Sequence, residues 1–255
     1  MIRDLLGLPV LASEHGEKVD NLIIYMHWLM IVLFVGWVAY FLYVIWRFRK
    51  SRHPKADHTG ARGHTSTWIE GLVALVEMVL LFGLAIPWWA QLVDKPPSEN
   101  ESLVLRVVAQ QFGWNVRYPG LDRVFAKQDI KLVNSTNKFG VVASDAPGKD
   151  DFGDFNSIRV PVNKPVIIHL TSMDVIHSFK VIALRVCQDA IPGLSIPVWF
   201  KAKTPGRYQI NCAQLCGNGH AQMAQGFITI DSQEEFDKWY AQQSKGGGAT
   251  ATTFE

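Results

Sequence analysis

Cysteine is scarce in this chain: there are three among 255 residues, too few for a disulfide framework. The excess of one sign of charge over the other is small as well. The formal net charge is +2 at pH 7, so binding of nucleic acid has no electrostatic support. These absences exclude a disulfide-stabilised scaffold and a nucleic-acid-binding protein. The length allows one large domain or two ordinary ones, and a hydrophobic content of 48% directs attention to long apolar runs.

Charged residues are absent altogether from residues 21–46. As a helix this run would be about 39 Å long, enough to cross a hydrocarbon core of about 30 Å with tilt. Tyr and Trp side chains lie towards both ends, as they do at membrane interfaces. A second apolar run, residues 68–92, contains Glu70 and Glu77. These two share a helix face, and because charge is costly at membrane depth we expect Glu77 to face protein or a water-filled path.

The charge of the connecting loop gives the orientation. Residues 47–67 hold Arg47, Arg49, Lys50, Arg52, Lys55 and Arg62 against Asp57 alone. The positive-inside rule places this loop in the cytoplasm and both termini on the other side. The predicted organisation is an outer N-terminal segment (1–20), a transmembrane hairpin (21–92, with spans 21–46 and 68–92), an outer domain (93–243) and a flexible, Gly-rich tail (244–255).

Residues 1–20 allow a signal-peptide interpretation, with an apolar region ending near Ala12 and Ser13. Pro9 interrupts that region and Arg3 is the single basic residue ahead of it, so cleavage is not expected. An interfacial or capping segment is the interpretation that remains.

The outer domain consists of short strand-like runs separated by turn residues such as Pro-Gly. The predicted strands are 103–109, 115–118, 130–132, 157–160, 166–171, 178–182, 198–201, 207–212 and 226–230. Many short strands at close spacing favour a β-sandwich or barrel. Residues 232–243 are predicted to form a terminal helix, with Ser232 as N-cap and Glu235 completing a capping box. Cys187 has no ligand-like neighbours and is predicted to be a small buried apolar residue.

Potential metal ligands concentrate in one short stretch, at Cys212, Cys216, His220 and Met223. Thiolates, imidazoles and thioethers select copper or zinc over magnesium or calcium. A further imidazole must come from elsewhere, and His177, between two predicted strands, is the best placed. Such ligands on a β-domain are typical of electron-transfer copper sites, and this set is large enough for two coppers. A structural zinc site or a redox Cys pair stays open, although zinc gains little from Met and its ligand pairs are usually spaced more widely.

Three motifs together resemble one family. Residues 212–223 (CAQLCGNGHAQM) resemble the CuA loop of subunit 2 of cytochrome c oxidase, and residues 174–179 (DVIHSF) and 188–193 (QDAIPG) match that family in the expected order. The resemblance covers about residues 20–240. It implies a two-helix transmembrane hairpin followed by an all-β, cupredoxin-like domain, a Greek-key sandwich or barrel.

The resemblance also implies roles for individual residues. Cys212 and Cys216 would bridge two coppers, His177 and His220 would each bind one, and Met223 and the backbone carbonyl of Gln214 would be axial ligands. Asp174 and Asp189 fall on positions near the subunit 1 interface or the docking surface of the donor. Glu70 falls where the family keeps a glutamate at the mouth of a proton-uptake channel.

The implied function is electron transfer within a respiratory terminal oxidase, a multi-subunit enzyme of a bacterial-type inner membrane with this domain on the periplasmic side. The CuA centre would accept electrons from a cytochrome c donor and pass them to haem in subunit 1, where oxygen is reduced to water with proton translocation. The chain would carry the relay and no catalytic residue. The alternatives are a CuA subunit of a nitric oxide reductase, a membrane-anchored copper chaperone of the thioredoxin-like type, and a structural zinc domain.

Three positions depart from the family. Gln214 replaces a Glu whose side chain binds an interface magnesium ion, and a neutral amide lacks the anionic oxygen that a hard cation prefers, which argues against that magnesium site. Leu194 replaces an Arg. Phe112 replaces the Trp through which electrons enter, so Phe112 and the nearby Trp114 are the candidates for the point of electron entrance.

The charge of the outer domain bears on the donor. Residues 101–240 hold 15 Lys and Arg against 13 Asp and Glu, whereas a domain that steers a basic soluble cytochrome c is expected to be acidic. Asp150, Asp151 and Asp154 form the one local acidic cluster, which is interpreted as a solvated loop. We therefore expect a donor that is membrane-attached or held in a supercomplex and docks through apolar contacts.

Overall fold

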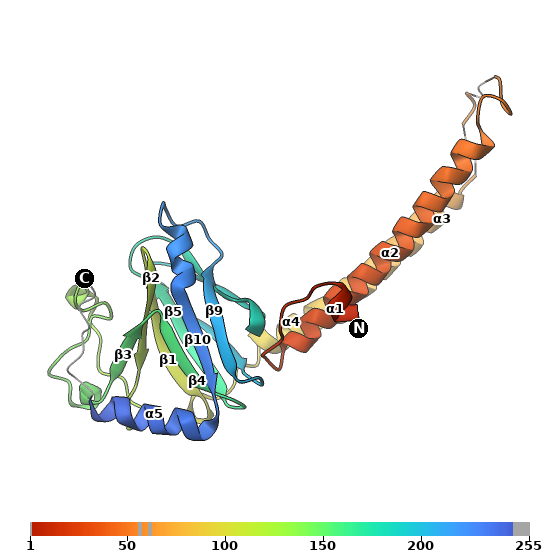
Figure 1. Ribbon diagram of the computed structural model, residues 1–255. Coiled ribbons are helices and arrows are strands. Elements are labelled where there is room, and N and C mark those ends of the chain that lie inside the picture. The colour runs from red at the N-terminus through yellow and green to blue at the C-terminus, as the bar shows by residue number, and fades with distance from the viewer. Residues whose placement is uncertain (1, 56–57, 61–62, 247–255) are drawn as a thin grey trace. The chain divides into compact units, whose positions relative to one another are not determined.

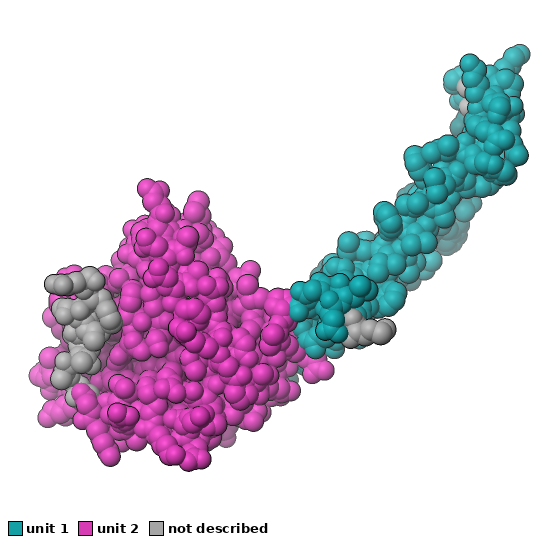
Figure 2. Space-filling view, viewed as in Figure 1, with its two compact units in different colours: residues 1–8, 18–95 teal, residues 9–17, 96–255 magenta. Residues whose placement is uncertain are grey.

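The computed structural model describes residues 2–55, 58–60 and 63–246 (Figure 1). The chain divides into two compact units (Figure 2). The first contains residues 1–8 and 18–95, and the second contains residues 9–17 and 96–255. Part of the connecting loop, including Asp57 and Arg62, and residues 247–255 of the predicted tail lie outside the described residues.

The first unit is helical. It contains α1 (Ile2–Leu5), α2 (Gly16–Arg47, which starts in the second unit), α3 (Thr65–Met78) and α4 (Ile86–Val93), and a π-helical stretch, Val79–Ala85, connects α3 to α4. Within the described part of the chain, two helices, 16–47 and 65–93, are long and apolar enough to cross a membrane. They contain the two predicted apolar runs. Large apolar side chains point outwards along both, as lipid-facing residues do.

The second unit contains two five-stranded sheets. One has the strand order β3-β2-β1-β5-β8 and the other β4-β10-β9-β6-β7. The strands are β1 (Leu103–Gln110), β2 (Gly113–Tyr118), β3 (Phe152–Phe155), β4 (Ser157–Pro161), β5 (Pro165–Ser172), β6 (His177–Val181), β7 (Val186–Ala190), β8 (Ile196–Lys201), β9 (Gly206–Cys212) and β10 (Gly226–Asp231). Helix α5 (Gln233–Lys245) follows β10.

The core of this unit comes from alternating side chains. In β1, Leu103, Leu105, Val107 and Ala109 are buried, which is the period of two expected for a strand with one face on the core. They belong to one cluster of buried residues with side chains from both sheets, and Trp114, Tyr118, Phe179 and Phe200 are its largest fully buried members. The prediction of an all-β domain is confirmed.

Some of the strands predicted from the sequence differ from those in the structure. Residues 130–132 form a 3₁₀-helix, so the predicted strand is wrong; the side chain of Asp129 accepts a hydrogen bond from the Lys131 amide (2.9 Å) and caps the turn. Strands β3 and β7 were not predicted. In β7 the buried residues are Val186 and Ala190, and Cys187 faces solvent. The expectation of a buried Cys187 is therefore wrong, because strand alternation on this edge strand points its side chain outwards.

Helix α5 begins as predicted. Ser232 is the N-cap, and its hydroxyl and the Glu235 carboxylate make the reciprocal bonds of a capping box. The helix runs on through Ser244, which is buried, to Lys245. The tail boundary predicted at residue 244 is corrected accordingly.

The N-terminal segment 9–17 belongs to the β-sheet unit. The Ala12 amide donates to the Ala183 carbonyl (2.8 Å), and the Ala12 carbonyl accepts from the Lys203 amide (2.7 Å). The Ser13 hydroxyl donates to the Leu184 carbonyl (2.6 Å). Ala12 and Ser13 are buried. The segment is a hydrogen-bonded part of the domain surface, a role that the apolar pattern of residues 1–20 did not indicate.

A long connection, residues 119–151, joins β2 to β3 and is fastened by one buried ion pair. Arg117 and Asp151 are both buried, and Asp151 Oδ2 accepts from Arg117 Nε (3.0 Å) and from the Ala126 amide (2.9 Å). Asp150 Oδ2 accepts from the Leu121 amide (2.6 Å). The interpretation of this acidic cluster as a solvated loop is thus wrong for Asp151, whose charge is matched inside the fold.

Candidate metal centre

The predicted ligands lie at the ends of structural elements. Cys212 is the last residue of β9, His220 begins a 3₁₀-helix (His220–Gln225), and Cys216 lies in the connection between them. His177 is the first residue of β6, which pairs with β9. The Ala213 amide donates to the Ser178 carbonyl (2.9 Å). Pairing of β6 with β9 therefore brings His177 beside the Cys loop although 35 residues separate His177 from Cys212.

Two thiols and two imidazoles converge at this point. Cys212 Sγ and Cys216 Sγ are 4.0 Å apart. His177 Nδ1 lies 4.0 Å from Cys212 Sγ, and His220 Nδ1 lies 3.4 Å from Cys216 Sγ. The donor atoms of His177, Cys212 and Cys216 all lie within 4.8 Å of one another. Each thiol therefore has one imidazole beside it: Cys212 has His177, and Cys216 has His220.

The remaining predicted ligands surround this group. The carbonyl oxygen of Gln214 lies 3.0 Å from Cys212 Sγ, and the Gln214 side chain is exposed. Met223 is fully buried, and its carbonyl accepts from Trp114 Nε1 (3.1 Å). The structure thus keeps Gln214 at the site through its backbone, and Met223 lies in the same buried cluster as Cys216.

Asp174 orients His177. Its Oδ1 lies 2.8 Å from His177 Nε2, which leaves Nδ1 towards Cys212. Its Oδ2 accepts from the Gln111 amide (2.6 Å). Partial burial by itself would raise the pKa of Asp174, but the hydrogen bonds from His177, Gln111 and Val175 outweigh it and hold the pKa below its ordinary value. A carboxylate on the far nitrogen of an imidazole is the usual support of a metal-binding His.

The pKa of the Cys216 thiol lies above its ordinary value in the metal-free site. Burial and the neighbouring Cys212 raise the pKa of Cys216 to about 11. Because a thiolate is the ligand, a bound metal ion must displace this proton, and metal affinity then falls as the pH falls. The donor set of soft thiols and imidazoles with Asp174 behind one of them fits copper by its chemistry.

Phe112 and Trp114 occupy different depths. Phe112 is half-buried and lies over the Cys loop, since a Cβ placed on Gly219 would come within 2.3 Å of Phe112 Cδ2. Trp114 is fully buried and meets the Phe179 ring edge-on, with centroids 5.3 Å apart. Trp114 is enclosed by the protein and offers no surface to a donor. Electron entrance through Phe112 or Trp114 stays a prediction.

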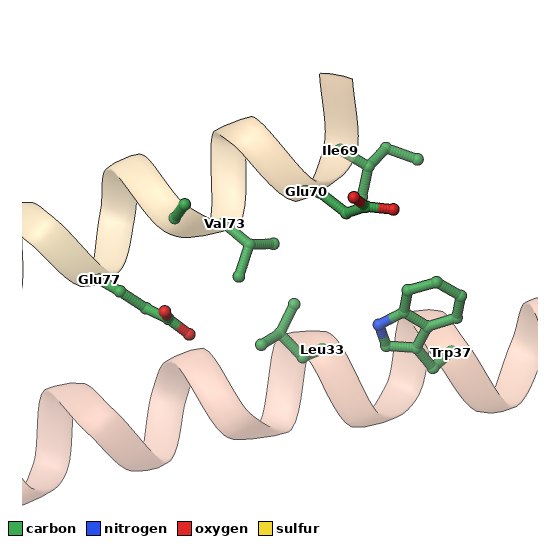
Figure 3. Close-up of a pocket in the computed structure, with 7 residues that line it drawn as sticks. Leu33, Trp37, Ile69, Glu70, Val73 and Glu77 are labelled. Atoms are coloured by element: carbon green, nitrogen blue, oxygen red, sulfur yellow. The ribbon is translucent and has the colours of Figure 1, made fainter. Parts of the chain in front are cut away.

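Other predicted residues lie away from the thiols. Asp189 is exposed on β7, opposite Ser178 in the β6–β7 ladder, and Leu194 is 52% exposed. Glu70 and Glu77 lie on the helical unit, and the structure gives them a common pocket of about 230 Å³ (Figure 3). Leu33 and Trp37 of α2 form its opposite wall. The two carboxylates share one face of α3, as their spacing predicts.

Gln111 contacts the site and was not predicted. Its side-chain amide donates to the Cys216 carbonyl (2.6 Å). The available signal was its position directly before Phe112, in the Gln-Phe-Gly-Trp stretch that joins two strands.

These features define a class before any comparison. A two-sheet domain with a Cys-Cys-His loop and a His-bearing corner, on a chain with two described helices of membrane-spanning length, is typical of membrane-anchored, cupredoxin-like metalloproteins. Comparison with known sequences then gives the family. The sequence profile "Cytochrome C oxidase subunit II, periplasmic domain" matches residues 103–230, and the chain belongs to that family.

The chain is also similar to individual proteins. The chain is 27% identical over 240 residues to the alternative cytochrome c oxidase subunit 2 of Bradyrhizobium diazoefficiens, covering 93% of this chain and 84% of the relative. It is 28% identical over 240 residues to cytochrome c oxidase subunit 2 of Cereibacter sphaeroides, covering 87% and 77%. The crystal structure of the periplasmic domain of subunit II of cytochrome oxidase of Bradyrhizobium japonicum is 29% identical, with a TM-score of 0.43, over 60% of this chain and 99% of that one.

Membership of this family indicates the general function of the chain. Its members are subunits of haem–copper oxidases, which are oxidoreductase complexes, and copper and electron transport follow from membership. The chain is accordingly a membrane-anchored subunit of such a complex.

Proposed function

We propose that this chain holds a dinuclear copper centre, CuA, and relays single electrons through it. Cys212 and Cys216 would bridge the two ions, His177 and His220 would each bind one, and Met223 and the Gln214 carbonyl would complete the set. The observation that carries the proposal is the pairing of thiols 4.0 Å apart with one imidazole beside each. One tetrahedral zinc ion would instead require all four donors around a single point.

Copper bound there would supply a one-electron carrier. The chain's own residues supply rigidity: Cys212 and His177 sit at the ends of paired strands, and Cys216 and Met223 are buried. A cage of this kind limits the movement of ligands when charge changes. The proposed task of these residues is to hold copper, so the proposal is a relay within a larger enzyme.

The proposed path runs from a cytochrome c-type donor to haem in subunit 1, where oxygen is reduced to water and protons are translocated. In this proposal the anchor lies in a bacterial-type inner membrane with the second unit on the periplasmic side, following the charge of residues 47–67. Asp189, exposed on β7, is a candidate for the docking surface. The neutral, exposed side chain of Gln214 supports the absence of an interface magnesium ion.

Glu70 is the proposed site of proton uptake. It lies near the loop end of the second span, and the pocket that it shares with Glu77 is otherwise lined by apolar side chains. A carboxylate in such surroundings is retained at a cost and is by default a functional candidate. Substituting Glu70 by Gln in the assembled oxidase should slow proton uptake and leave the copper signal intact.

Copper loading of the purified full chain tests the centre. The expected result is a purple protein with two coppers per chain and an electron-spin resonance pattern from one electron shared by two copper nuclei. Cys216→Ser should abolish that pattern, and Cys187→Ser, at an exposed thiol outside the group, should retain it. A colourless protein that takes up one zinc ion would contradict the proposal.

A salt titration tests the donor. A donor that docks through apolar contacts should deliver electrons at a rate that changes little with ionic strength, since screening acts on charges. A steep fall of the rate with added salt would show electrostatic steering and contradict this part of the proposal.

A further inference from the structure

Gln111 touches both ligand-bearing segments of the candidate centre. It lies between β1 and β2, in a chain segment that supplies none of the proposed ligands. Its side-chain Nε2 donates to the Cys216 carbonyl (2.6 Å), and its backbone amide donates to Asp174 Oδ2 (2.6 Å). Asp174 in turn holds His177 Nε2 at 2.8 Å. A continuous hydrogen-bonded chain therefore runs from Cys216 through Gln111 and Asp174 to His177.

The two thiols are held by different partners. Cys212 ends a strand, and the neighbouring Ala213 amide and Ser178 carbonyl bond at 2.9 Å. Cys216 follows in a connection without regular structure, and Gln111 is the partner that the structure gives its carbonyl. The position of Cys216 relative to Cys212 and His177 thus depends on a residue 105 positions away in the chain.

The loop after Cys216 leaves space for the hydrogen bond from Gln111. Gly217 has φ of +132°, and a Cβ there would lie 2.8 Å from Gln111 Nε2. A side chain at residue 217 would be strained and would push the amide away from Cys216. The backbone conformation after Cys216 is therefore matched to the approach of Gln111.

We propose that Gln111 is a positioning residue of the copper centre, which fixes Cys216 against Cys212 and His177 before metal enters. This inference rests on the proposed function, because it assigns Gln111 its purpose through that centre. A hydrogen bond to a carbonyl adds little to global stability, but it removes freedom from one loop residue whose sulfur must be placed accurately.

The test uses the full chain and Gln111→Met, a substitution of similar length that has no donor. In the metal-free protein, amide hydrogen exchange at residues 213–219 should accelerate by about 2- to 10-fold, the loss expected for one hydrogen bond. After copper loading, the electron-spin resonance pattern should change or become heterogeneous, an effect that a purely structural role would not produce. The matched control is Gln128→Met, because Gln128 Nε2 also donates to a backbone carbonyl, that of Phe139 (2.9 Å).

Gly217→Ala provides a second variant, since it keeps the Gln111 side chain and displaces it; it should reproduce both effects if Gln111→Met does not fold. Wild-type exchange in residues 213–219 together with an unchanged copper spectrum would overturn the inference. Failure of the wild-type chain to form a dinuclear centre would overturn the proposed function instead, and with it the purpose assigned to Gln111. The exchange comparison separates these cases because it needs no metal.

Discussion

The imidazole of His177 shows how a single side chain is aimed. It is fully buried, with Asp174 on one ring nitrogen and Cys212 on the side of the other. The two oxygens of Asp174 have separate tasks, since Oδ1 receives His177 and the Val175 amide and Oδ2 receives the Gln111 amide. The orientation of the His177 ring therefore depends on the Asp174 carboxylate, and both oxygens of that carboxylate must accept their hydrogen bonds.

Asp174→Asn should weaken copper binding by about 10- to 100-fold, the usual cost of losing a carboxylate behind a metal-binding imidazole. An Asn keeps one acceptor, so its amide nitrogen must face the donor of either His177 or Gln111. Copper retention against a graded chelator measures the effect. Asp189→Asn, at an exposed position on β7, is the control and should retain copper like the wild type. Equal retention in both variants would contradict the role given to Asp174.

At the scale of elements, the turn between β1 and β2 lies on the Cys loop. Phe112 contributes the apolar contact, and Gly219 permits it by having no side chain. The loop and the turn are therefore fitted to each other, so that a change in either one displaces the other.

Gly219→Ala should lower the free energy of unfolding by about 1–3 kcal/mol, because the new methyl group overlaps Phe112 in a packed site. The displaced loop should also hold less copper, and adding Phe112→Ala should recover copper occupancy by removing the overlap. Thermal unfolding followed by near-ultraviolet circular dichroism, with copper content, gives the comparison. A Gly219→Ala protein as stable as the wild type would show that Phe112 does not rest on the loop.

The connection between β2 and β3 depends on a second element-scale contact, the ion pair of Arg117 and Asp151. Both side chains are buried, so removing one charge strands the other. Asp151→Asn should destabilise the domain by about 3–5 kcal/mol in chemical denaturation. Glu234→Gln, which breaks the exposed pair with Lys238 on α5, should cost at most about 0.5 kcal/mol. Similar losses in the two variants would contradict the burial of the first pair.

At the scale of the whole molecule, the chain passes between the two units three times. The connections lie at residues 8–9, 17–18 and 95–96. The N-terminal segment 9–17 is hydrogen-bonded into the β-sheet unit, with Glu14 donating its amide to the Lys201 carbonyl (2.9 Å). Removal of this segment would expose the backbone groups that it covers, such as the Lys201 carbonyl.

The proposed topology predicts how thiols react in intact cells. In a Cys212→Ser, Cys216→Ser background, the exposed Cys187 is the remaining thiol and should react with a membrane-impermeant maleimide from outside. A cysteine introduced by Ser66→Cys, with the three natural thiols removed, should react after the membrane is opened. Labelling in the reverse order would contradict the assignment of residues 47–67 to the cytoplasm.

Much of this protein could be predicted from local sequence. Apolar runs without charge, strand alternation and the capping box at Ser232 depend on residues close together in the chain, so they are visible in the sequence. The same holds for the Cys-Cys-His-Met spacing, where four ligand types fall within one loop. The errors fall where local pattern is weak: residues 130–132 are too short for periodicity to separate a strand from a turn, and β7 carries polar residues.

By itself, the sequence determined that the chain has two membrane-length helices, an all-β domain and a soft-metal loop, because composition and spacing decide these features. Tertiary structure alone decided that Trp114 is enclosed, that Cys187 faces solvent, that Asp151 is paired with Arg117 and that Gln111 links Cys216 to Asp174. Each of these depends on which strands are neighbours. Contacts between residues far apart in the chain exist only once the two sheets have been assembled.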